Sequence, residues 1–100
     1  MPENRRADTI LKWWLDGDTD GGEVIVEALI RPVPSSRSMS GLAVDAVVTL
    51  NGTEIAARHM CLGEHEAREY ALAMARAAIG ALEQVHGRRG EREEVQHHGR

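Results

Sequence analysis

The sequence predicts one α+β domain with the order helix, strand, strand, strand, helix (α-β-β-β-α). Three observations predict it: runs rich in β-branched residues in the middle of the chain, the dipeptide Asn51-Gly52 between two of them, and a long helical repeat of apolar residues after Gly63. The 100 residues allow one modest hydrophobic core. We therefore expect a single domain over residues 1–86 and a disordered tail over residues 87–100.

The first predicted element is a short amphipathic helix that ends at Leu15. Asn4 is suited to cap its N-terminus, and Trp13 falls on the side opposite to the apolar residues Ala7, Ile10, Leu11 and Trp14, which recur at helical spacing. The aspartates and glycines of residues 16–22 favour turns, so we expect the helix to end before them.

Three strands follow. Val24, Ile25 and Val26 indicate a strand over residues 23–31, which Pro32 ends. Residues 41–50 and 53–62 form the predicted hairpin, because Asn-Gly is the favoured pair for a type I′ turn. An unbroken register from this turn pairs Val48 with Ile55 and Ala46 with Ala57 on the core face. It pairs Val47 with Ala56, Asp45 with Arg58 and Ala43 with Met60 on the other face.

The last element is a helix over residues 64–86. Its inner face is rich in alanine, and such small side chains allow a helix to pack closely on a sheet. We therefore expect a three-stranded antiparallel sheet with one face covered by this helix.

Residues 42–82 resemble the double-stranded RNA-binding domain, because a strand, Asn51-Gly52, a second strand and Gly63 lead into an alanine-rich helix. In that family a basic cluster of the pattern Lys-Lys-x-Ala-Lys opens the helix and contacts phosphates. Here the matching residues are Glu64, His65, Glu66, Ala67 and Arg68. Carboxylates at two of these positions repel phosphate, so the resemblance supports the topology and counts against RNA binding.

The turn after the first element resembles an EF-hand calcium loop. Its matching positions are Asp16, Asp18, Asp20, Gly21 and Glu27, which follow the pattern D-x-D-x-D-G-x5-E. The resemblance implies calcium ligation by the four carboxylates and a calcium-regulated domain. An acidic, solvated turn is the alternative, because Pro32 leaves little room for the exiting helix.

His59, Cys61 and His65 are a second candidate metal site, since their spacing offers three zinc ligands. The alternative is a partly buried histidine and a small hydrophobic cysteine beneath the helix. The sequence contains no phosphate-binding glycine loop, nucleophile elbow or H-E-x-x-H motif. We therefore expect no enzymatic activity and no resident cofactor, with calcium as the open possibility.

Charge and composition restrict the partners. The net charge of −4 disfavours binding to nucleic acid, for which Arg37, Arg68 and Arg76 are the residues available. One cysteine predicts a reducing, cytoplasmic setting. No apolar stretch has the length of a signal peptide or a membrane span.

The leading functional hypothesis is a non-catalytic module that binds another protein, as a homodimer or with a different partner. The predicted surface is the sheet face that the last helix leaves uncovered, with Trp13 as an added anchor. It consists of Trp13, Ile25, Leu29, Ala43, Val47, Ala56, Arg58 and Met60. The alternative is that the first helix covers this face. Small acidic chains also occur among phage-encoded inhibitors of bacterial defence, anti-CRISPR proteins included, and this is the class that we expect by association.

Overall fold

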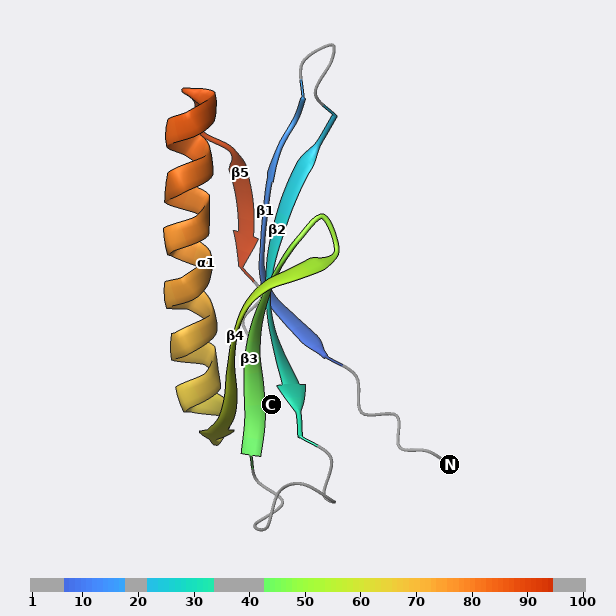
Figure 1. Cartoon of the computed structure of the whole chain (residues 1–100), viewed down its shortest axis with the longest axis vertical. Helices are drawn as coiled ribbons and strands as arrows, with labels where there is room; N and C mark the ends of the chain where they lie inside the picture. Colours follow the sequence, from blue (N-terminus) through green and yellow to red (C-terminus); the bar gives the residue numbers. More distant parts are fainter. Residues whose placement is uncertain (1–6, 18–21, 34–42, 95–100) are drawn as a thin grey trace.

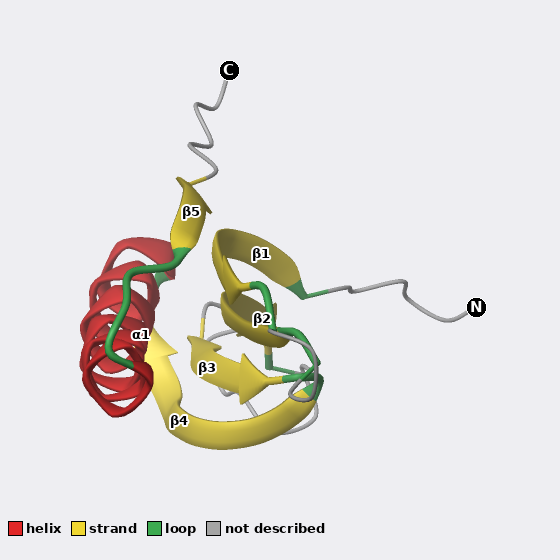
Figure 2. Cartoon of the chain, turned by 90° about the horizontal axis from the view of Figure 1, so that it is seen from above, coloured by secondary structure: helices red, strands yellow, loops and turns green. Residues whose placement is uncertain are grey.

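The computed structural model describes residues 7–17, 22–33 and 43–94, which form five strands and one helix (Figure 1). The elements are β1 (Asp8–Leu15), β2 (Val24–Pro32), β3 (Ala43–Leu50), β4 (Thr53–Leu62), α1 (Glu64–His86) and β5 (Glu91–Glu94). The strands make one antiparallel sheet in the order β4-β3-β2-β1-β5, and α1 covers one of its faces (Figure 2). The α+β class is confirmed, but the predicted three-stranded sheet with a helix at each end is wrong.

The first element is a strand and not the predicted helix. Leu11, Trp13 and Leu15 alternate toward the core, as side chains of a strand do. The pairing with β2 shifts between Thr9 and Leu11, so Ile10 is an extra residue that is buried as well. This bulge places two adjacent apolar residues inside the protein, which imitates helical spacing in the sequence. The predicted element order that begins with a helix is therefore wrong.

The order of the strands from β2 to β4 and the turn between β3 and β4 follow the prediction, whereas the register of β3 and β4 does not. Asn51 and Gly52 have φ angles of 49° and 85°, as a type I′ turn requires. Asn51 also bonds to β2, because its N–H donates to Ile25 O and its Oδ1 accepts from Ile25 N–H, both at 2.7 Å. The hairpin turn is thus anchored on the neighbouring strand, and this anchor extends the sheet beyond the ladder itself.

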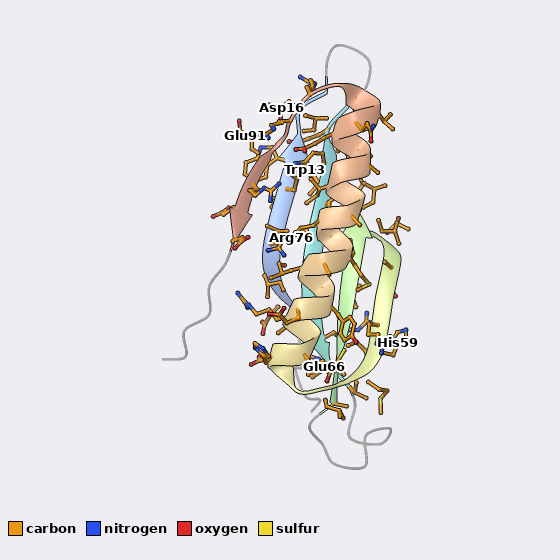
Figure 3. The ribbon with its side chains drawn as sticks, turned by 90° about the vertical axis from the view of Figure 1, so that its left-hand side faces the viewer. Trp13, Asp16, His59, Glu66, Arg76 and Glu91 are labelled. Atoms are coloured by element: carbon orange, nitrogen blue, oxygen red, sulfur yellow. The ribbon has the colours of Figure 1, made fainter. Side chains whose placement is uncertain are left out.

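The core lies between α1 and the covered sheet face. The helix buries Ala67, Ala71, Ala75 and Ile79, so the predicted alanine-rich contact is confirmed. The sheet contributes the buried side chains of Ile10, Leu11, Trp13, Leu15, Val26, Ala28, Ile30, Ala46, Val48 and Cys61. Small helix residues let the two layers approach closely, and one large side chain, Trp13, fills the space near the end of α1 (Figure 3).

Strand β5 replaces part of the predicted disordered tail. Residues 91–94 pair with Leu11–Trp14 of β1, although all four of their side chains are exposed. Glu83 Oε2 accepts hydrogen bonds from Gly90 N–H at 3.0 Å and from Trp13 Nε1 at 3.2 Å. The Gly90 bond, helped by Trp13 and by nearby arginines, lowers the pKa of Glu83. A polar sequence can form this strand because backbone bonds and Glu83, rather than apolar burial, hold it.

Candidate functional site

Exposed hydrophobic side chains gather on strand β4. In the described part of the chain four large hydrophobic side chains are exposed, and three of them belong to β4: Ile55 (46%), Met60 (47%) and Leu62 (80%). The fourth is Val85 (79%), near the end of α1. Strand β4 is also the last in the sheet, since no other strand of the described ranges pairs with its outer edge. We call Ile55, Met60 and Leu62 the β4 surface.

Two irregularities in the β3–β4 ladder set the direction of these side chains. The pairing runs from Thr49–Glu54 directly to Val48–Ala56, which leaves Ile55 as an extra residue. Near the other end Ala46 pairs with Arg58 and Val44 with Cys61. The predicted unbroken register is therefore wrong beyond Glu54, because each added residue moves the following side chains to the opposite face.

Asp45 fixes the second irregularity. Its Oδ1 accepts a hydrogen bond from Met60 N–H at 2.9 Å, and its Oδ2 lies 3.2 Å from His59 Nδ1 and 3.5 Å from Arg31 Nη2. Met60 has a φ of 60°, an uncommon conformation for a side chain of its size. The contact between Asp45 and the Met60 N–H accounts for that conformation, so Asp45 determines how Met60 is presented.

The hydrogen bonds and charges around Asp45 lower its pKa more than burial raises it. Burial of this side chain, which is 14% exposed, acts to raise the pKa of its carboxyl. The hydrogen bond from Met60 N–H acts in the opposite direction, as do His59 and Arg31, and the net result is a lowered pKa. Arg31 also reaches Glu54 Oε1 at 3.7 Å, so β2, β3 and β4 are joined by one ionic cluster.

Leu62 is held at the junction between β4 and α1. Its N–H donates to Glu66 Oε1 at 3.1 Å, and Gly63, with a φ of 108°, turns the chain into the helix. This conformation favours glycine, which explains the residue found there. Glu66, which Figure 3 labels near the start of α1, therefore ties the exposed Leu62 to the first turn of the helix.

The structure keeps only part of the predicted sheet-face patch together: Leu29 and Val47 are paired across β2 and β3, whereas other members lie elsewhere. Trp13 lies beneath α1 with no exposed surface, and Ala43 and Val47 are buried as well. Ala56 pairs with Val48, and Arg58 pairs with Ala46 and stacks on Tyr70 of α1 at 4.5 Å from the ring centre. Ile25 and Leu29 are half-buried in β2, and Met60 alone of the eight belongs to the β4 surface.

Sequence reasoning missed Ile55 and Leu62 at this site because the unbroken register assigned Ile55 to the core. One signal for a break was present: the alternation expected of a strand fails between Met60, Cys61 and Leu62, which are all apolar neighbours.

The candidate metal ligands do not come together in the described residues. Asp16 is exposed after β1, Glu27 lies within β2 opposite Lys12, and Asp18 and Asp20 lie outside the described ranges. His59 points away from the core of the sheet, whereas Cys61 is buried, so they do not share the predicted face. Over residues 7–17, 22–33 and 43–94 no group of three His, Cys, Asp or Glu side chains is arranged to hold a metal ion.

The single thiol is a core group. Cys61 is buried under α1, and its Sγ lies 3.5 Å from Arg58 O. Burial raises the pKa of the Cys61 thiol, and the negative charge of Glu66 acts in the same direction. The thiolate that nucleophilic or metal chemistry requires is therefore disfavoured at this position.

Two of the three predicted basic residues lie in the part of the chain that the structure describes. Arg37 lies outside the described ranges, Arg68 is half-buried on α1, and Arg76 is exposed two turns further along that helix. Glu64 and Glu66 occupy the first turn of α1, where the RNA-binding family has basic residues.

No model of a known protein family matches this chain, and neither the curated proteins nor the solved structures include a significant match. Among the described residues, no helix combines the length and the apolarity that crossing a bilayer requires.

Proposed function

We propose that this chain is a non-catalytic protein-binding module and that the β4 surface contacts its partner. The observation that carries the proposal is the location of the exposed hydrophobic side chains: three of the four in the described residues lie on the same edge strand. An edge strand presents its side chains to an approaching molecule on both faces and along its rim. Exposed apolar side chains along an unpaired edge strand offer an interaction surface to a partner.

The β4 surface offers enough apolar area to matter for affinity. Complete burial of an aliphatic side chain contributes roughly 1.5–3 kcal/mol, so burying the exposed parts of Ile55, Met60 and Leu62 contributes about 4 kcal/mol. That free energy corresponds to about three orders of magnitude in Kd before the costs of association are subtracted. The partner surface that fits is therefore apolar at its centre.

We expect a partner to bind the second half of β4 through side-chain contacts rather than by adding a strand through backbone hydrogen bonds. Met60 N–H is already bonded to Asp45, and Leu62 N–H to Glu66. Irregular, partly satisfied edge strands resist the addition of a further strand. A partner that seats Met60 and Leu62 in pockets suits this arrangement better than an added β-strand does.

The experiment combines partner recovery with a matched control. The tagged full chain recovers binding proteins from an extract of its source, and the purified partner is titrated by calorimetry against the wild type, Leu62→Asp, Met60→Asp and Val85→Asp. Val85 is the control because it is as exposed as Leu62 but lies at the far end of α1. We expect at least a tenfold rise in Kd for the two β4 variants and no change for Val85→Asp. A Kd unaffected by Leu62→Asp and Met60→Asp contradicts the proposal, as does an equal loss with Val85→Asp.

A further inference from the structure

Strand β5 is joined to the sheet almost entirely through its backbone. It pairs with β1 over residues 91–94, and all four of its side chains are exposed. Its departure from β1 consequently removes no apolar side chain of its own from a buried environment. This distinguishes β5 from the other strands, each of which buries at least one side chain.

The residues that β5 and Gly90 cover depend on this strand for their contacts. Gly90, just before the strand, lies against the Trp13 indole so closely that a Cβ there would be 2.5 Å from Trp13 Nε1. Glu83 Oε2 uses the Gly90 N–H as one of two donors. Without β5, the edge of β1 loses its hydrogen-bond partners and Trp13 loses its contact with Gly90. Pairing of another extended segment with the free edge of β1 would therefore restore these hydrogen bonds and contacts.

A segment that pairs with this edge of β1 must meet specific sequence requirements. It needs a glycine where the chain passes Trp13, followed by an extended stretch with an acidic residue opposite Lys12, which here is Glu93. Arg88 adds a hydrogen bond to Asp16 O. Every copy of this chain carries such a segment at residues 87–94, so the occupant that fits best is the β5 of another copy.

The connection between α1 and β5 has a joint at Gly87. This residue ends the helix with a φ of 71°, and its N–H donates to Glu83 O at 2.8 Å. Glycine also adopts negative φ values at little cost, so a change at this one residue redirects the four-residue connection. The same sequence can therefore direct β5 toward its own β1 or away from it.

We propose that β5 exchanges between two copies of this chain, the β5 of each pairing with the β1 of the other. Exchange of an identical element preserves the pairing of β5 with β1, so its cost is confined to the hydrogen bonds at the Gly87 joint and to the entropy of association. The inference goes beyond the proposed binding function, because it concerns the opposite edge of the sheet and names a second copy as the occupant. Residues of the β4 surface take no part in it.

A mixing experiment with cysteine variants tests the exchange. In a Cys61→Ala background, one preparation carries Lys12→Cys and the other Glu93→Cys, two positions that lie directly opposite each other across β1 and β5. The control preparations carry Glu27→Cys and Thr49→Cys, which are opposed across the inner strands β2 and β3. Each pair is mixed over a range of concentrations and oxidised, and covalent dimers are counted on a non-reducing gel.

We expect a covalent heterodimer from the Lys12→Cys and Glu93→Cys mixture that increases with concentration and exceeds the control mixture at least fivefold. Light scattering gives an independent measure: a concentrated wild-type sample should contain dimer that a chain ending at Gly90 lacks. A yield no greater than that of the control, or equal dimer content with and without β5, overturns the proposal.

Discussion

The contact between Gly90 and Trp13 makes Gly90→Ala the most informative single change in this fold. The added Cβ would lie 2.5 Å from Trp13 Cε2, Trp13 Nε1 and Trp14 O, whereas ordinary contacts at a Cβ begin at 3.4 Å. One of the two segments must therefore move by about 1 Å. Trp13 has no exposed surface and is packed between β1 and α1, so we expect β5 to be displaced instead.

The cost follows from what the displacement breaks. The ladder between β5 and β1 spans four residue pairs, and a hydrogen bond of this kind contributes about 0.5–1.5 kcal/mol net. The side chains of β5 add little because they are exposed. We therefore expect Gly90→Ala to lower the free energy of unfolding by about 2–3 kcal/mol while the other four strands and α1 remain folded.

Urea denaturation followed by tryptophan fluorescence measures the free energy, and amide hydrogen exchange of residues 11–14 reports whether β5 still covers β1. Gly80→Ala is the matched control, because Gly80 lies within α1 and a Cβ there meets nothing within 4 Å. This control should gain up to about 1 kcal/mol from helix propensity. Wild-type stability and unchanged protection of residues 11–14 in Gly90→Ala would refute the reasoning.

Three further predictions concern single side chains. Because the pKa of Asp45 is lowered in the folded protein, its stabilising contribution is present above the unfolded carboxyl pKa of about 3.9 and is lost as the pH falls through the folded value. The difference in unfolding free energy between wild type and Asp45→Asn should thus shrink between pH 6 and pH 2 in urea titrations; a constant difference contradicts this. Asn51→Ala removes the acceptor for Ile25 N–H and should cost about 1–2 kcal/mol by the same assay, whereas a neutral effect would exclude the anchoring role. The buried Cys61 thiol should react with a thiol reagent at least a hundredfold more slowly in the folded than in the urea-unfolded protein, and equal rates would show that it is accessible.

Those parts of the fold that depend on local sequence could be predicted. Asn51-Gly52 specifies a turn by its backbone preferences alone, and residues 64–86 repeat their small apolar side chains over six turns. Both elements have the predicted bounds. Strand β2 could also be predicted, because Val24, Ile25 and Val26 are β-branched residues at successive positions.

The errors arise where a single added residue or a distant partner decides the structure. The bulge at Ile10 makes a strand look helical, and the extra residue at Ile55 transfers Arg58 from the open face to the side of Tyr70. Strand β5 has no apolar pattern that would predict a strand. Its position depends instead on the contacts of Gly90 with the Glu83 carboxylate and with Trp13, which the local sequence does not reveal. The candidate site was only partly foreseen for the same reason: Met60 was named, but its neighbours on β4 were placed by a register that the bulges alter.

The pairing of β1 with β5 has a consequence for how the chain folds. Trp13 of β1 and Glu83 of α1 are 70 residues apart in the sequence, and β1 and β5, which pair with each other, are the first and the last strands of the described chain. Contacts of such long range close a large loop and form slowly, whereas the hairpin of β3 and β4 closes through two residues. During synthesis β5 leaves the ribosome after every other described element, so the edge of β1 can be paired only after β2, β3, β4 and α1 have been made.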